Sequence, residues 1–172
     1  HHSIFLPENY KNTMKSIFIN KHLPEDPLIY LNRPTKTDST AAPEGDDTIS
    51  AFIPMGHVDN NKSQNWQMIR EKGRQALTYK LKKCNIHNFE KSIKFEFCYS
   101  PETMMDKYNF TWGALFGSLS HNLSQIGYLR PQNQHKFYKN IYFVGGCTHP
   151  GSGIPMVFFS AKQVCERIIN GS

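Results

Sequence analysis

The stretch NIYFVGGCTHPGSGIPMVFFSAKQVCERI, residues 140–168, combines an apolar run, a glycine-rich loop and a second, longer apolar pattern. Residues 140–146 hold consecutive apolar side chains of high β propensity and close on glycine, which predicts a buried strand. From Ile154 onward apolar residues recur at spacings of three and four, which predicts an amphipathic helix. Pro155 suits the first turn of that helix, and Gly171 suits its end. We therefore expect a strand, a glycine loop and a helix in succession.

The glycine loop is a candidate ligand site, because it places Gly145, Gly146, Gly151 and Gly153 between a strand and a helix. Such a loop directs main-chain N–H groups and the positive end of the helix dipole toward whatever lies over it. A phosphate or the electron-rich edge of a reduced flavin would suit that position. A tight turn also uses glycine for positive φ, and this simpler explanation stays open. We favour a ligand because the glycines exceed what a simple turn requires.

Spacing alone leaves that ligand unnamed. The loop is no P-loop, because no Gly-Lys-Ser/Thr follows it. Residues 151–156 begin like the dinucleotide fingerprint but fail it at the last position.

Composition bounds the class of protein. The chain has 172 residues, a net charge of +6 and a mean hydropathy of −0.55. No apolar run approaches the roughly 20 residues that span a bilayer, which excludes a transmembrane helix, and the first residues lack a secretory signal pattern. The four cysteines are widely spaced and form no CxxC motif, so neither a metal site nor a disulfide framework is expected. Reduced thiols in a cytoplasm are the simplest interpretation. Basic residues gather in 70–84 and 130–139, which allows an anionic partner, although solvated helix faces explain them more simply.

The remaining segments read as alternating strands and helices. Apolar patterns bounded by turn residues predict strands within 3–7, 26–34, 47–55 and 92–100. Helical spacing predicts helices within 8–21 and 64–83, and Ser100 followed by Pro101 predicts the start of a third. Residues 35–47 read as a loop. The uncharged segment before Arg130 is either a core helix or the lining of an apolar cavity.

Residues 142–162, YFVGGCTHPGSGIPMVFFSAK, resemble the C-terminal signature of the bacterial carotenoid desaturases, FAD enzymes of the phytoene-desaturase type, whose usual form is close to YFVGAGTHPGGGIPGVLLSAK. The blocks HHSIFLPENYKN, LPEDPLIYLNRPTKTDSTAAPEG and LSQIGYLRPQN resemble further family blocks in the same order. The resemblance therefore covers essentially the whole chain. It implies an FAD-dependent oxidoreductase that introduces C=C bonds into a long polyene in carotenoid biosynthesis.

The same resemblance implies a fold and a place within it. Family members are much longer and bind the FAD pyrophosphate through an N-terminal GxGxxG motif, which this chain lacks. We expect an α/β fold and the C-terminal fragment of a two-domain enzyme, inactive alone. Residues 1–135 would form part of a substrate-binding domain with a mixed sheet, and residues 136–172 would return to complete a Rossmann-like FAD domain. His1 and His2 match a double histidine of the family, although a purification tag would also explain them.

The resemblance also implies site residues. Those along the flavin nucleotide or beside its ring are Gly145, Gly146, Cys147, Gly153, Ile154, Pro155 and Met156. Family members commonly have glycine at the positions of Cys147 and Met156. The flavin pocket is therefore expected to be narrower here than in typical members. The residues expected to line a tunnel for the polyene are Phe110, Trp112, Leu115, Phe116 and Tyr128, although ordinary core packing also accounts for them. His149 is a candidate acid or base, although a hydrogen-bonding role is commoner for a histidine in such a turn.

Two rival functions remain. A carotenoid terminal-methyl oxidase on the same fold is favoured by Met156 and disfavoured by Thr148-His149-Pro150. A non-enzymatic phosphate- or nucleic-acid-binding module is disfavoured because the basic residues are not interleaved with aromatic ones. The expected partner is thus a polyene and not a nucleic acid, with peripheral attachment of the basic helix to anionic lipid as a further option.

Overall fold

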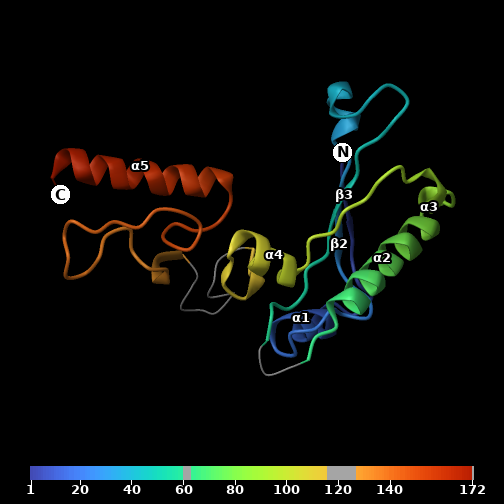
Figure 1. The fold of residues 1–172 in the computed structure, drawn as a ribbon, viewed down its shortest axis with the longest axis horizontal. Helices are drawn as coiled ribbons and strands as arrows, with labels where there is room; N and C mark the ends of the chain where they lie inside the picture. The colour runs from blue at the N-terminus through green and yellow to red at the C-terminus, as the bar shows by residue number, and fades with distance from the viewer. Residues whose placement is uncertain (60–62, 116–126, 172) are drawn as a thin grey trace. The chain divides into compact units, whose positions relative to one another are not determined.

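The computed structural model describes residues 1–59, 63–115 and 127–171 (Figure 1). The chain divides into two compact units, His1–Cys98 and Tyr99–Ser172. We describe each unit by itself.

The first unit contains a three-stranded antiparallel sheet in the order β1-β2-β3 (Figure 1). The strands are β1 (His2–Phe5), β2 (Ile29–Asn32) and β3 (Ser50–Phe52), so three of the predicted strands are confirmed. Side chains along β2 alternate between buried and half-buried, because successive residues of a strand face opposite sides of the sheet. Ile29 and Leu31 lie on the buried side.

Three helices complete the first unit. They are α1 (Tyr10–Phe18), α2 (Trp66–Lys83) and the short α3 (Phe89–Ser92). The side chain of Asn9 caps α1, and that of Asn65 caps α2 by accepting from the main-chain N–H of Met68 at 3.0 Å. The small core contains residues from α1, α2 and the sheet. Its buried apolar residues are Ile17, Ile29, Leu31, Val58 and Leu81. Two 3₁₀ turns, η1 (Pro34–Lys36) and η2 (Ser39–Ala41), lie in the predicted loop.

The second unit is mainly helical in its described residues. It contains α4 (Pro101–Tyr108), the 3₁₀ turns η3 (Thr111–Gly113) and η5 (Gly127–Leu129), and α5 (Ile154–Asn170). Ser100 caps α4 and Gly171 ends α5 in a left-handed conformation, as the sequence predicts. Both signals are local, which is why the sequence reveals them.

The strand predicted within residues 92–100 is wrong. Residues 93–100 form no strand, and Phe95 and Phe97 are 82% and 74% exposed. A strand gains its main-chain hydrogen bonds from a neighbouring strand. No described strand pairs with this segment, so no sheet forms in which its alternating apolar side chains could be buried.

The buried strand predicted at residues 140–146 is also wrong. Its only β pairing in the described part of the chain is an isolated bridge between Tyr142 and Gln134. The main-chain N–H of Phe143 donates to the oxygen of Asn133 at 2.8 Å, and that of His135 donates to the oxygen of Ile141 at 2.9 Å. A buried strand needs partner strands on its edges and layers on its faces. Here the segment instead runs beside residues 133–135 and leaves its apolar side chains partly exposed.

The mixture of helices and strands agrees with the predicted class, although the described sheet is antiparallel. In the described ranges no helix is both long enough and apolar enough to cross a membrane.

Candidate cofactor-binding loop

The glycine loop, residues 145–153, adopts main-chain conformations that need glycine. Gly145 has φ of +122° and Gly153 has φ of +103°, in a region that other residues rarely adopt. A Cβ added to either glycine would meet no atom within 4 Å. The main chain is therefore open at both positions, and a ligand can approach it closely.

Helix α5 begins directly at this open main chain. Gly153 is its N-cap and has no side chain that could cap the first turn, and the N–H of Val157 makes a helical bond to the oxygen of Gly153 at 2.9 Å. The orphan N–H groups and the positive end of the helix dipole thus lie at an exposed position. Gly153, Ile154, Pro155 and Met156 are all exposed there.

Three residues, Arg130, Pro131 and Asn133, contact the loop, and we call them the brace. Arg130 Nη1 donates to the oxygen of Gly146 at 2.6 Å, and a Cβ on Gly151 would lie 3.4 Å from Arg130 Nε. The main-chain oxygen of Pro131 accepts from Thr148 Oγ1 at 2.7 Å and from the N–H of His149 at 2.9 Å. A guanidinium therefore lies against two glycines of the loop.

Asn133 completes the brace from inside. Its side chain is fully buried, with Nδ2 lying 3.1 Å from the oxygen of Phe143, 2.8 Å from that of His149 and 2.9 Å from Ser160 Oγ. Ser160, also fully buried, accepts from the N–H of Gly145 at 3.4 Å. No sequence pattern indicated a role for Asn133, although it ends LSQIGYLRPQN, one of the blocks that carry the family resemblance.

The predicted cofactor residues gather in this one unit. A Cβ on Gly146 would lie 3.4 Å from the Cα of Ser152, so the two ends of the loop lie against each other. The Cys147 thiol is exposed. His149 is half-buried with its ring stacked on that of Tyr128, their centroids 5.5 Å apart. Their roles toward a cofactor stay predictions.

The residues predicted for a substrate tunnel are spread over two parts of the second unit. Trp112, Leu115 and Tyr128 are exposed and Phe110 is half-buried. Phe116 lies outside the described residues. Tyr128 lies against the glycine loop through His149, and the tunnel itself stays a prediction.

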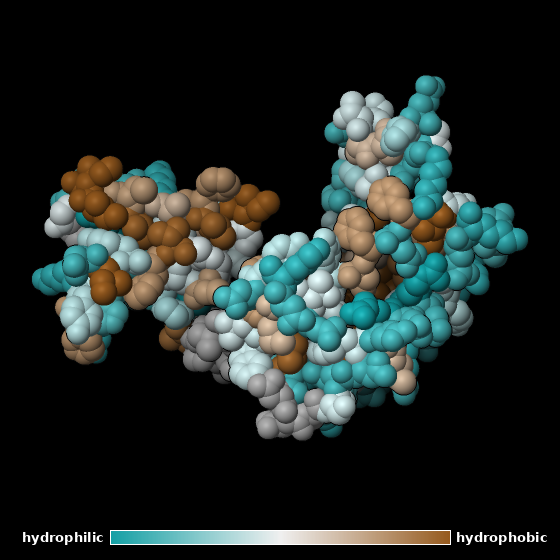
Figure 2. Space-filling model, viewed as in Figure 1, coloured by the Kyte–Doolittle hydropathy of each residue, from teal (hydrophilic) through white to brown (hydrophobic). Residues whose placement is uncertain are grey.

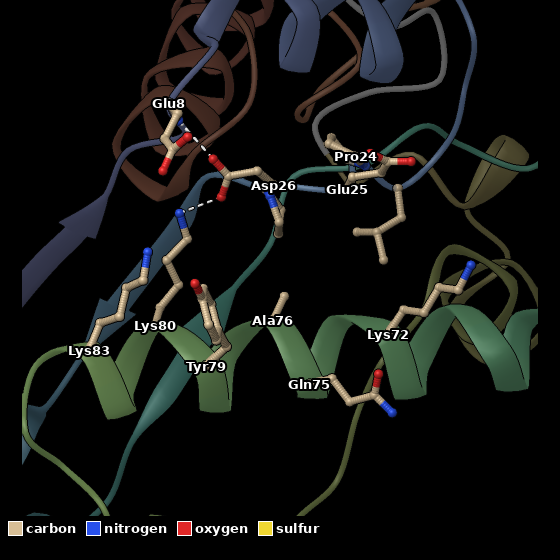
Figure 3. A pocket seen from close by; sticks show the side chains of 12 residues that line it. Glu8, Pro24, Glu25, Asp26, Lys72, Gln75, Ala76, Tyr79, Lys80 and Lys83 are labelled. Carbon is tan, nitrogen blue, oxygen red and sulfur yellow. Dashed lines mark hydrogen bonds and ion pairs between the residues drawn. The ribbon is translucent and has the colours of Figure 1, made fainter.

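A pocket of about 560 Å³ lies in the first unit, between residues 23–27 and α2 (Figure 3). Lys80 Nζ binds Asp26 Oδ1 at 2.5 Å, and Asp26 Oδ2 accepts from the N–H of Glu8 at 2.7 Å. The hydrogen bond from Lys80 is the main reason why the pKa of Asp26 lies below its ordinary value. Charges of both signs line this pocket, so it does not suit a polyene.

At least three of the six basic residues of α2 form ion pairs. Arg74 binds Glu96 at 2.8 Å and Glu90 at 3.2 Å, and Lys82 binds Glu90 at 3.3 Å. Together with the pair of Lys80 and Asp26, these ion pairs offset part of the positive charge that would attract an anionic surface.

Among residues 1–59, 63–115 and 127–171, no group of His, Cys, Asp or Glu gathers to hold a metal ion. The four cysteines carry free thiols.

Comparison with known proteins identifies relatives along nearly the whole chain. Phytoene desaturase from Fusarium fujikuroi is 32% identical over 99% of this chain and 33% of the relative. The zeta-carotene-forming phytoene desaturase from Myxococcus xanthus is 36% identical over 98% of this chain and 32% of the relative. The 1-hydroxycarotenoid 3,4-desaturase of Flavobacterium sp. (strain P99-3) is 34% identical over 98% of this chain and 34% of the relative. No protein-family model matches the chain.

The chain is therefore a homologue of the carotenoid desaturases of bacteria and fungi. Its resemblance to the phytoene-desaturase type is confirmed. The chain spans about a third of the length of the curated relatives it matches, and the signature that it carries is the C-terminal one.

Proposed function

We propose that this chain is the C-terminal part of an FAD-dependent carotenoid desaturase that introduces C=C bonds into a phytoene-type polyene. The observation that carries the proposal is the open glycine loop at the uncapped start of α5, within a chain whose relatives are named phytoene desaturases. In the complete enzyme, FAD would supply the two-electron oxidising power for desaturation.

The loop fits a flavin by its shape and its electrostatics. The main chain is open at Gly145 and Gly153, so a flat ligand can lie against it without meeting a Cβ. The start of α5 favours negative charge at Gly153, and the guanidinium of Arg130 lies behind the loop. These are the properties that the nucleotide and ring of FAD require.

Roles within the loop follow from its two ends. Gly145, Gly146 and Cys147 would hold the nucleotide, because this end of the loop is braced and its main chain is accessible at Gly145. Gly153, Ile154, Pro155 and Met156 would lie beside the flavin ring. The exposed apolar side chains of Ile154 and Met156 would exclude water there.

Under this proposal the chain contributes to two domains of the complete enzyme. Residues 1–135 would belong to the substrate-binding domain, and residues 136–172 would complete the FAD domain. Large apolar side chains lie exposed along α5, visible as the brown surface of this helix in Figure 2. Those more than half exposed are Ile154, Phe158, Ile168 and Ile169. An apolar surface of this kind requires a cover, which the remainder of an FAD domain would provide.

The substrate would be a long apolar polyene. Phe110, Trp112, Leu115, Phe116 and Tyr128 remain our candidates for its tunnel, supported by their apolar character. The free thiols of the cysteines suit a cytoplasmic enzyme. Because ion pairs offset only part of the positive charge of α2, this helix would remain available for peripheral attachment to anionic lipid.

The test is product analysis with the full-length protein that contains this chain. The protein is incubated with FAD, an electron acceptor and phytoene in liposomes, and the carotenoids are then separated and their absorption spectra recorded. We expect products with longer chromophores and unchanged carbon and oxygen content. Products that gain a terminal aldehyde or acid would instead identify the oxidase alternative.

A non-enzymatic function makes a different prediction. A phosphate- or nucleic-acid-binding module would bind nucleic acid with an affinity that falls steeply with salt, and would leave phytoene unchanged. That combination of results would overturn the proposal.

A further inference from the structure

We propose that Asn133 is a positioning residue that fixes the glycine loop in its binding geometry before a ligand arrives. The proposal rests on the ligand-binding function proposed above for the loop. It concerns a residue of the brace that lies outside the loop and outside the predicted cofactor set.

The chemistry around the Asn133 side chain determines how its amide is oriented. Two of its three neighbours, the oxygens of Phe143 and His149, are main-chain carbonyls that only accept hydrogen bonds. Nδ2, and not Oδ1, therefore faces these two carbonyls. The opposite orientation would place Asn133 Oδ1 against both carbonyl oxygens, which is unfavourable.

In this orientation Nδ2 also lies 2.9 Å from Ser160 Oγ, so three acceptors share its two hydrogens. The serine oxygen accepts in addition from the N–H of Gly145 at 3.4 Å. Asn133 Oδ1 is buried without a hydrogen-bond partner in the described part of the chain. Burying an amide oxygen without a hydrogen-bond partner costs free energy. The hydrogen bonds that Nδ2 donates have to outweigh that cost.

The contacts of Nδ2 with the two carbonyls reach one residue just before the glycine loop and one within it. Phe143 lies just before Gly145, and His149 lies shortly before Gly151. The main-chain oxygen of Asn133 also accepts from the N–H of Phe143 at 2.8 Å. Residues 144–148 are thus held between two fixed points, and Ser160 links them to α5. A loop held in this way loses little conformational freedom when a ligand binds.

The adjacent residue offers a matched control. Gln132 has the same amide chemistry, but it is exposed and its Nε2 reaches only the oxygens of Tyr128 and Arg130, at 3.3 and 3.5 Å. A substitution there removes an amide that contacts neither Phe143 nor His149.

The experiment compares Asn133→Leu with Gln132→Leu in the full-length protein. Amide hydrogen exchange is followed in peptides that cover residues 142–150, with peptides from β1 and β2 as an internal reference. In Asn133→Leu we expect exchange about tenfold faster in the loop peptides and unchanged in the reference. We also expect a dissociation constant for FAD about tenfold higher. Gln132→Leu should change neither quantity.

A second variant keeps the test informative if Asn133→Leu folds poorly. Asn133→Asp can donate one hydrogen bond when protonated and none when ionised. We therefore expect its FAD affinity, relative to wild type at the same pH, to fall as pH rises. A merely structural role would not produce this pH profile.

Three outcomes would overturn the proposal. One is unchanged loop exchange in Asn133→Leu; another is equal acceleration in the reference peptides, which would indicate general destabilisation. The third is faster loop exchange with unaltered FAD affinity. If the wild-type protein itself fails to bind FAD, the proposed function fails, and the exchange comparison, which uses no flavin, still decides whether Asn133 fixes the loop.

Discussion

Asp26 illustrates how a single side chain joins distant parts of the first unit. Its carboxylate forms an ion pair with Lys80 of α2 and accepts a hydrogen bond from the N–H of Glu8, which precedes α1. Its pKa is lowered, above all by the hydrogen bond from Lys80. Because the folded state favours the ionised form, the pair stabilises the protein above the ordinary pKa of aspartate. That stabilisation is lost as pH falls through the lowered value.

We therefore predict that Asp26→Asn lowers stability near neutral pH and has little effect in acid. The expected loss is about 0.5–1 kcal/mol, since Asp26 is partly exposed and water screens the pair. Thermal unfolding measured across the acid range should show the difference between variant and wild type shrinking as Asp26 becomes protonated. Glu25→Gln, which alters an exposed neighbouring carboxylate, is the control. A pH-independent difference for Asp26→Asn would contradict this account.

Whether the role of a single residue could be predicted depends on how far along the chain its contacts lie. Ser100, Pro155 and Gly171 were predictable because a helix end is determined by the residues at that end. Asn133 was not, because its contacts lie 10 to 27 residues away along the chain. No local pattern distinguishes it from Gln132.

Among the elements, α2 anchors the extended segment that follows α3. Arg74 Nε contacts both oxygens of Glu96, at 2.8 and 3.0 Å, and Arg74 Nη1 contacts Glu90. The segment between Ser92 and Tyr99 makes no strand pairing in the described residues. Arg74 is therefore one tether of this segment, and the ion pair of Lys94 with Asp46 at 2.7 Å is another.

From this tether we predict that Arg74→Gln increases the rate of chymotrypsin cleavage after Phe95 and Phe97 about threefold or more, as local opening becomes easier. Limited digestion followed by mass spectrometry of the fragments measures this rate. Lys72→Gln removes an exposed charge from the same helix and should leave the rate unchanged. Equal cleavage of the Arg74 variant and wild type would show that the tether does not hold the segment.

The elements also show where sequence patterns stop being sufficient. Every helix predicted from spacing and caps was found, because a helix satisfies its main chain internally. The strands predicted at 92–100 and 140–146 were not found, because a strand depends on partners that its own sequence does not contain. Of the candidate site, the open glycines and the start of α5 followed from sequence, whereas the brace did not.

At the scale of the whole molecule, the described residues bury few large apolar side chains and expose many. The exposed set includes the apolar side of α5 (Figure 2). This pattern agrees with a chain that spans about a third of its relatives. A complete desaturase would bury this surface between its parts.

We accordingly predict that the 172-residue chain alone binds the dye ANS strongly and binds FAD weakly, without turnover. Exposed apolar surface gives the dye its fluorescence, and under the proposed function the loop alone would supply only part of a flavin site. Replacing Phe158 and Ile169, both largely exposed, by Ser should lower the dye fluorescence without lowering the unfolding temperature. Unchanged fluorescence would contradict our assignment of this surface.

The most direct test of the proposed function is the flavin content of the full-length protein, measured after reconstitution with FAD and removal of the excess. We predict close to one FAD per chain in the wild type. Gly153→Val, which places a β-branched side chain at positive φ on the open main chain, should reduce that content severely. A correctly folded wild-type protein that retains no FAD, or a Gly153→Val variant that retains as much as wild type, would contradict the claim that this loop binds the flavin.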